Sequence, residues 1–292
     1  MSVPPPSVTR MTDSPPLPAE LRPLFRRVAA GHHALNSSLP AGRLVGAEEG
    51  SDPRPVLWMS EGPAPVGLWE ALHRERRTSG LWPLLLAPLR DEPDFRPWGS
   101  QELFPDQMSS PDSQDAPDLL RQWWEGIAGW EDEDPEEEAE RRAITAPFGP
   151  SWPGLAPAGA LTRSPDEHAR ACAAALLQVR PALRIGLVAG TDGAAALASC
   201  GWSGPLNHEN DMGRVAGVLR SWEQRFGAQV VAVGFDTLDL SVAAPPANLD
   251  EALLVAAEHL ALCPDNILQG VGTLSAYAEH LVDADVWTLW WD

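Results

Sequence analysis

Hydrophobic and polar positions follow their most regular pattern in residues 163–292. Apolar residues spaced three or four positions apart predict helices over 164–179, 194–199, 211–226 and 248–262, and a further helix that ends near residue 282. Short apolar or alternating runs predict strands over 184–189, 229–235, 238–242 and 286–291. Capping-box patterns start two of the helices, at Ser164 and Asn248. Because strands and helices do not alternate one by one, this order predicts an α+β domain.

The amino-terminal half has a less regular pattern. It predicts helices over 19–30, 66–77 and 118–129, strands over 43–46, 56–59 and 81–86, and a loop over 87–116. We therefore expect an α+β fold: a mixed sheet flanked by helices, with a less regular amino-terminal half and an acidic, partly disordered insertion. The expected division is a disordered proline-rich tail (1–19), an amino-terminal α/β portion packing on the main domain (20–100), an acidic and proline-rich insertion or linker (101–162) and a carboxy-terminal α+β domain (163–292).

The charge composition excludes several classes of function. The 292 residues contain 41 Asp and Glu against 21 Lys and Arg, a formal net charge of −20, and every one of the 21 cations is arginine. Without lysine there is no phosphate-loop lysine and no Schiff-base chemistry. A chain this acidic also lacks the basic surface that nucleic acids and anionic membranes require. We therefore expect no nucleic-acid partner and no membrane partner.

The negative charge is concentrated in residues 101–140. This segment holds 14 acids and one arginine, Arg121, a net charge of −13, and it ends in the acidic run 131–140. Like charges at this density repel and stay solvated, which predicts an exposed loop or a frayed helix. The functional alternative is a surface that is complementary to a basic protein. The sequence leaves both interpretations open.

Two polar clusters in the carboxy-terminal domain are candidates for a pocket. The first is Asn207 to Asp211, where a histidine beside carboxylates could bind a metal or shuttle a proton, although such residues also form turns and cap helices. The second is Glu258-His259 on a helix, followed by Cys263-Pro264-Asp265-Asn266 at its end. The candidate ligand-binding residues are Asn207, His208, Asp211, Glu258, His259, Asp265 and Asn266.

The metal and cofactor hypotheses are weaker. His208, His259 and Cys263 have the ligand chemistry of a zinc site, but their spacing matches no metal signature. A core histidine and a Pro-Asp-Asn helix stop are the structural alternatives. The glycine-containing segment 186–193 has neither the spacing of a dinucleotide loop nor a lysine, so we interpret it as a turn. We expect no metal, no cofactor and no catalytic residue.

Several segments of the sequence resemble a known protein family. They are Gly201-Trp-Ser-Gly-Pro-Leu-Asn-His208, Val218-Leu-Arg-Ser-Trp-Glu-Gln-Arg-Phe-Gly227, Val233-Gly-Phe-Asp-Thr-Leu238, Ala257-Glu-His259, Cys263-Pro-Asp-Asn266 and the final Trp-Trp-Asp. In this order they resemble the bacterial domain-of-unknown-function family numbered 4253 (DUF4253), which is common in actinomycetes. The resemblance covers about residues 180–292. Because the family name carries no activity, it implies no catalytic residue.

These observations favour a cytoplasmic bacterial protein that acts by interaction rather than catalysis. No secretory signal or membrane span is visible in the pattern, and three widely separated cysteines form no disulfide framework. The partner we expect is a basic protein bound through residues 101–140, and one version is an immunity-type protein that masks a toxin. The alternative is an enzyme, or a domain that binds a small ligand or metal in the His/Asp/Glu pocket. The oligomeric state stays open.

Overall fold

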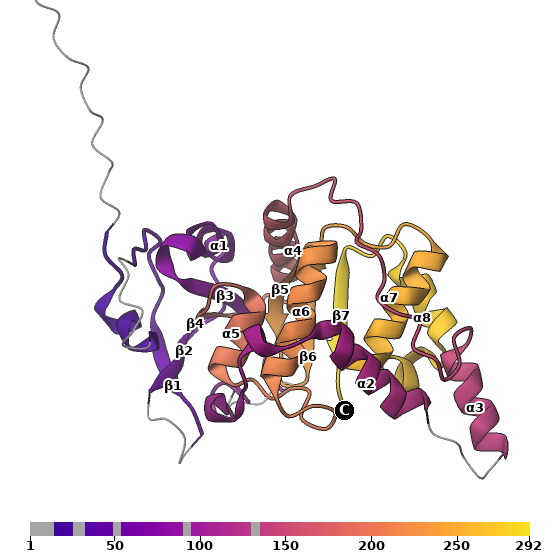
Figure 1. The fold of residues 1–292 in the computed structure, drawn as a ribbon. Coiled ribbons are helices and arrows are strands. Elements are labelled where there is room, and N and C mark those ends of the chain that lie inside the picture. The colour runs from indigo at the N-terminus through magenta and orange to yellow at the C-terminus, as the bar shows by residue number, and fades with distance from the viewer. Residues whose placement is uncertain (1–14, 26–32, 49–53, 90–94, 130–134) are drawn as a thin grey trace, which may run out of the picture.

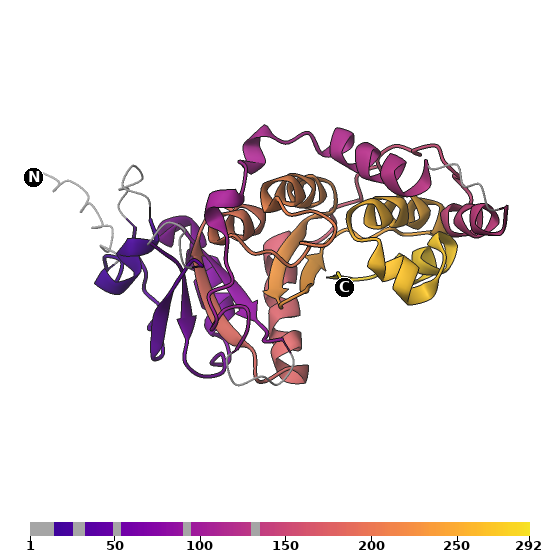
Figure 2. The ribbon, with the colours of Figure 1, turned by 90° about the horizontal axis from the view of Figure 1, so that it is seen from below.

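The computed structural model describes residues 15–25, 33–48, 54–89, 95–129 and 135–292. Within these ranges the chain forms a seven-stranded mixed sheet with helices on both of its faces (Figure 1). The view from below shows this layered arrangement, with α4 on the opposite side of the sheet from α5 and α6 (Figure 2). The predicted α+β class with a mixed sheet flanked by helices is confirmed.

The strand order does not follow the chain order. The strands are β1 (Gly42–Gly46), β2 (Pro55–Ser60), β3 (Leu81–Leu86), β4 (Arg184–Ala189), β5 (Ala228–Val233), β6 (Thr237–Val242) and β7 (Val286–Trp290). In the sheet they run β1-β2-β4-β3-β5-β6-β7. The pairing of β3 with β5 is parallel, and the other neighbouring pairs are antiparallel. Strands from both halves of the chain therefore interleave in one sheet.

Eight α-helices and four shorter helical turns are found in the described residues. The α-helices are α1 (Leu68–Ser79), α2 (Ala116–Ala128), α3 (Pro135–Thr145), α4 (Pro165–Val179), α5 (Gly193–Cys200), α6 (Met212–Phe226), α7 (Leu249–Leu262) and α8 (Leu274–Leu281). The turns are η1 (Ala19–Leu24), η2 (Pro105–Gln107), η3 (Pro111–Ser113) and the π-helical η4 (Asn266–Val271). Side chains of Ser164, Asp211 and Asn248 cap α4, α6 and α7 as their sequences predict.

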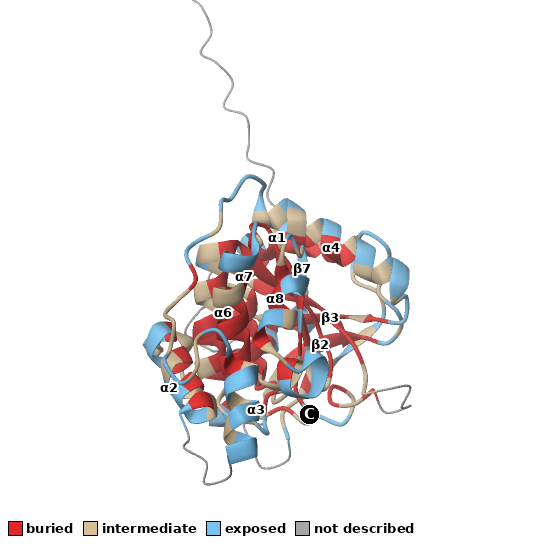
Figure 3. Ribbon diagram, turned by 90° about the vertical axis from the view of Figure 1, so that its right-hand side faces the viewer, coloured by how far each residue is buried: buried red, intermediate tan, exposed pale blue. Residues whose placement is uncertain are grey.

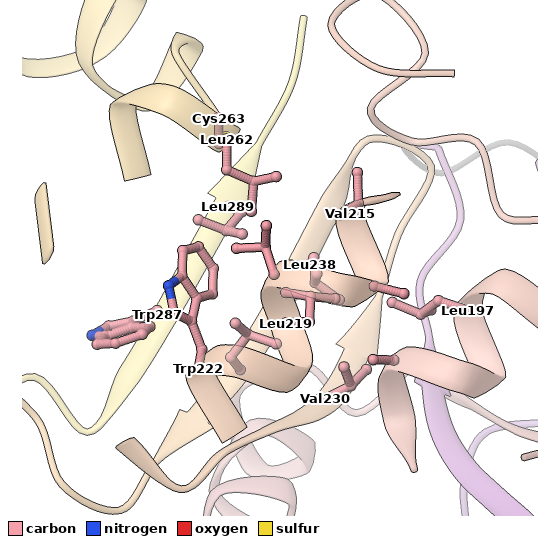
Figure 4. Packing of buried hydrophobic residues seen from close by; sticks show 14 of the residues in the cluster. Leu197, Val215, Leu219, Trp222, Val230, Leu238, Leu262, Cys263, Trp287 and Leu289 are labelled. Carbon is pink, nitrogen blue, oxygen red and sulfur yellow. The ribbon is translucent and has the colours of Figure 1, made fainter. Parts of the chain in front are cut away.

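Two apolar clusters cover the two faces of the sheet. Helices α1 and α4 pack on one face, and α5 and α6 pack on the other. On that second face, α2 packs in turn against α6 and α7. Figure 4 shows Leu219 and Trp222 of α6 meeting Leu238 of β6 and Trp287 and Leu289 of β7. All five of these side chains are buried. Most of the buried residues on the second face come from residues 193–292 and the helix α2, and the strands β1 to β4 and the loop after β3 supply others.

A proline lies inside the central strand β3. Pro83 has no N–H, so a proline in a central strand normally leaves a ladder acceptor without a donor. Here the indole Nε1 of Trp82, the preceding residue, donates to the carbonyl of Val230 in β5 at 3.1 Å. A register shift in β5 between Val230 and Ala232 accompanies this contact. The tryptophan side chain therefore adds a hydrogen bond between β3 and β5 beside the proline.

Some predicted elements differ from the structure. The helix predicted over 19–30 is a 3-10 turn that ends at Leu24, because Pro23 removes a backbone donor, and residues 26–32 lie outside the described ranges. The loop predicted over 87–116 contains η2 and η3. Residues 1–14 of the predicted tail also lie outside the described residues, whereas Leu17 is buried and donates its N–H to the carbonyl of His33.

Replacing Trp82 by Phe tests the role of the indole donor. Trp82 and Trp287 are both about 1% exposed, but the Nε1 of Trp287 has no hydrogen-bond partner among the described residues. Trp82→Phe leaves the buried carbonyl of Val230 without a donor, which costs about 1–3 kcal/mol beyond the lost volume. We expect urea unfolding to show Trp82→Phe less stable than Trp287→Phe by this amount. Equal losses in the two variants would contradict the assignment.

Candidate functional site

His259 lies in a cage of aromatic rings inside the core. Its ring centroid is 4.7 Å from those of Trp222 and Trp287, and 5.7 Å from that of Tyr277. The side chain is fully buried, and this burial lowers the pKa of His259 to about 3. The imidazole is therefore neutral at physiological pH, which suits a core histidine.

A short chain of hydrogen bonds fixes the His259 ring. Asn266 Nδ2 donates to the hydroxyl oxygen of Tyr277 at 2.8 Å, and that hydroxyl lies 3.1 Å from His259 Nδ1. If the hydroxyl proton is directed at Nδ1, both contacts are satisfied, and the imidazole proton is assigned to Nε2. Nε2 has no oxygen or nitrogen partner among the described residues and lies among the aromatic rings. The histidine thus links α7 to α8 and η4.

Asn266 and Cys263 hold the last strand in place. Asn266 Nδ2 also donates to the Thr288 carbonyl at 2.8 Å, and its Oδ1 accepts from the Trp290 N–H at 2.9 Å. The Cys263 thiol donates to the Trp290 carbonyl at 2.9 Å. Burial raises the pKa of Cys263 to about 12, so the thiol keeps its proton. Both side chains satisfy the outer edge of β7, which is otherwise an open sheet edge.

Glu258 is the most deeply buried carboxylate of the predicted pocket. Arg225 donates to both of its oxygens, at 2.7 and 2.6 Å. The indole Nε1 of Trp222 and the backbone N–H of Ala156 each donate to it at 2.7 Å. Four charge-assisted hydrogen bonds compensate the burial of the negative charge. Glu258 thereby fastens the proline-rich connector around Ala156 to α6 and α7.

Of the remaining predicted residues, Asp211 lies at the start of α6, whereas Asn207 and Asp265 meet at Asp292. Asp211 accepts from the backbone N–H groups of Gly213 at 2.9 Å and Ser109 at 2.8 Å, which caps α6 and fixes the loop before α2. Asn207 and Asp265 both hydrogen-bond to the backbone of Asp292, at the carboxyl end.

His208 packs its ring 5.6 Å from that of Trp123, and burial lowers its pKa. In the described part of the chain, no hydrogen bond, ion pair or ring contact joins His208 to His259. Nor do three or more His, Cys, Asp or Glu side chains group there as a metal site would require. The structure therefore joins His259 with Asn266 through Tyr277, and it brings Asp265 near both Asn207 and His208, but these groups form no single hydrogen-bonded centre with Glu258 and Asp211.

The acidic segment contains a helix, α2, that packs on the core. In α2, Leu120 and Trp124 are completely buried against α6 and α7, while Asp118 and Glu125 are about half exposed and pair with Arg121. The indole of Trp124 donates to the Pro150 carbonyl at 3.2 Å. The amphipathic pattern predicts this helix. The structure adds that the helix before the acidic run is hydrogen-bonded to Pro150, which follows the run.

Residues 135–145 form the helix α3, of which Figure 3 shows a largely exposed surface. The first turn holds Glu136, Glu137 and Glu138, where the positive end of the helix dipole stabilises carboxylates. Glu138 pairs with Arg141 and Arg142. Glu137 is exposed and has no ion-pair partner in the described ranges. The acidic run thus includes an ordered helix, and its residues 131–134 lie outside the described residues.

Comparison with known proteins bears on the carboxy-terminal part. Residues 184–292 match the family described as Domain of unknown function (DUF4253). The predicted resemblance is confirmed, and the DUF4253 match begins at β4 and extends to the last residue. Neither a curated protein nor a solved structure matches the chain.

The seven candidate residues all lie within the DUF4253 match, whereas α2 and α3 precede it. The description of DUF4253 assigns no activity to any residue. Among the described helices, none is both long and apolar enough to cross a lipid bilayer.

The neutral state of His259 predicts a pH-dependent stability. The unfolded histidine has a pKa of about 6.5, so between pH 6.5 and about 3 the unfolded chain holds a proton that the folded chain lacks. Stability therefore falls as the pH is lowered through this window, by about 1.4 kcal/mol per pH unit for each such histidine. We expect His259→Gln to reduce the slope by this amount in urea unfolding between pH 6 and 4.5. An unchanged slope would show that His259 is already charged in the fold.

Proposed function

We propose that this protein is a cytoplasmic, non-enzymatic interaction protein that binds a basic partner through the acidic surface of α2 and α3. The observation that carries the proposal is the support of this surface. Buried residues of α2 pack this helix against α6 and α7, and the Glu258–Arg225 pair holds the connector that follows α3, so the backbone that carries the carboxylates is supported before and after the acidic run. A fixed charge pattern loses less conformational entropy on binding than a disordered one.

The negative charge of this surface indicates a positively charged partner. Residues 101–140 carry a net charge of −13, and Glu137 and Glu140 are exposed and without an ion pair in the described part of the chain. Such a surface attracts a positively charged protein and accelerates its encounter, an effect that salt screens over about 8 Å at physiological ionic strength. An immunity-type protein that masks a basic toxin is the version we favour.

The alternative, an enzyme or a ligand or metal site at the predicted His/Asp/Glu pocket, receives less support. The oxygens of Glu258 and Asp211 already accept hydrogen bonds that hold the fold together. His259 is enclosed by aromatic rings. A substrate would have to displace these contacts before it could reach the side chains.

A pair of charge reversals tests the proposed surface. We expect the protein to recover a basic protein from a lysate of its native host at 50 mM salt and to release it at 500 mM salt. The double variant Glu137→Arg, Glu140→Arg loses this partner, because it replaces attraction by repulsion. Affinity purification with mass spectrometry measures the recovery.

The matched control is the double variant Glu20→Arg, Glu61→Arg. It changes the net charge by the same amount at exposed positions outside residues 101–140. This control is expected to retain the partner. Failure to recover any basic protein at low salt would contradict the proposal. If both double variants lose the partner equally, the effect comes from net charge and not from this surface.

A further inference from the structure

A cavity of about 720 Å³ lies at the end of the sheet where β4 stops and β3 begins. Its size is within the range of small-molecule sites, which is roughly 300–1,000 Å³. The walls come from distant parts of the chain: η1, the start of β2, the end of α1, the loop that carries η2 and η3, and the junction of β4 with α5. These elements meet on the side of the molecule opposite to α3 and α8 (Figure 1).

The charge of this cavity is opposite to that of the protein. Its described lining includes Arg54, Arg76, Arg77 and His33 and no Asp or Glu. In the chain as a whole, acids outnumber arginines about two to one. A concave, partly apolar surface with one sign of charge focuses the electric field and attracts small ions of the opposite sign. The cavity therefore favours an anion.

Arg76 and Arg77 have different roles at its wall. Arg76 is buried, and its Nη2 donates to both oxygens of Asp166 at 2.6 and 2.7 Å, so its charge is compensated. Arg77 is exposed at the end of α1 and forms no ion pair with any described residue. An arginine without an acid beside it keeps its planar set of donors available for a carboxylate, sulfonate or phosphate.

Small and apolar residues keep the cavity open and give it a nonpolar wall. Ala195 and Ala198 of α5 face it with single methyl groups, and Leu24, Val56 and Met108 contribute larger apolar surfaces. This combination fits a ligand that carries an apolar body as well as a charge.

Gly80 allows one side of the cavity to form. Its φ of +69° lies in the left-handed region, and a Cβ here would lie 2.7 Å from Cε1 of His33. Glycine thus permits the end of α1 and His33, both parts of the lining, to approach each other.

We propose that this cavity binds a small organic anion with an apolar body, and that Arg77 is the residue that recognises its charge. The site is separate from the acidic surface of α2 and α3 and does not depend on the protein partner proposed above.

Two fluorescent probes of similar shape test the charge preference. 8-Anilinonaphthalene-1-sulfonate carries an aromatic body and a sulfonate, and N-phenyl-1-naphthylamine is its uncharged counterpart. We expect the sulfonate to bind the full-length protein saturably at one site, more tightly than the uncharged probe. Raising the salt from 50 to 500 mM weakens the binding of the sulfonate and leaves the binding of the uncharged probe unchanged.

Three variants locate the site. Arg77→Glu raises the Kd of the sulfonate by at least about tenfold, as expected when a charged hydrogen bond is replaced by repulsion. Arg74→Glu is the matched control, because Arg74 is exposed on the same helix but does not line the cavity, and it changes the Kd by less than about twofold. Ala195→Leu fills part of the cavity and weakens the binding of both probes.

The outcomes decide the proposal. Thermal unfolding checks that each variant is folded, and Arg77→Gln replaces Arg77→Glu if the reversal is not tolerated. The proposal is overturned if Arg74→Glu weakens the sulfonate as much as the Arg77 variant does. It is also overturned if Ala195→Leu binds both probes like the natural sequence, or if no saturable binding is found.

Discussion

Strand β3 connects the two parts of the sheet, and the rest of the structure depends on this position. It pairs antiparallel with β4 from Leu81↔Ala189 to Leu86↔Arg184, and parallel with β5 at Leu85↔Ala232 and Leu86↔Val233. β4 and β5 both belong to the DUF4253 match, yet they are not neighbours in the sheet. Without β3, both strands would present buried backbone groups without partners, which is costly for each group. An amino-terminal strand thus completes the sheet of the carboxy-terminal part.

A second connection extends the same unit to the acidic segment. Glu258 accepts hydrogen bonds from Arg225 and from the backbone of Ala156, and Trp124 donates to the carbonyl of Pro150. The helix α2 and the connector therefore rest on α6 and α7, and α3 lies between them in the chain. The negative surface of α3 and the arginine-lined cavity lie at different ends of this unit. This separation allows a protein that is strongly acidic overall to keep a local preference for anions.

Local features of the fold could be predicted from the sequence, because each depends on residues close together in the chain. Ser164, Asp211 and Asn248 have the residue types of helix caps and act as such. The apolar run 81–86 is a buried strand in spite of Pro83. Its place between β4 and β5 has no local signature, because it rests on pairings across roughly 100 to 150 residues and on the contact of the Trp82 indole with Val230.

The candidate site shows the same limit. The burial of His259 agrees with its place on an apolar helix, but its contact with Tyr277 joins two helices and has no local signature. The cavity has no local sequence signature for a similar reason. Arg77, Thr191 and Ala195 are unremarkable in their own segments, and only the fold brings them to one wall. Gly190, which the sequence assigns to a turn, lies beside them and donates to the carbonyl of Gly80.

The dependence on β3 can be tested by separating the two parts of the chain. Residues 163–292 would be produced alone and again together with residues 1–162, and urea unfolding and the amide NMR spectrum would be recorded for both. We expect residues 163–292 alone to show no cooperative unfolding and a poorly dispersed spectrum, and we expect the addition of residues 1–162 to produce cooperative unfolding and a dispersed spectrum. A cooperative transition and a dispersed spectrum for 163–292 alone would contradict it.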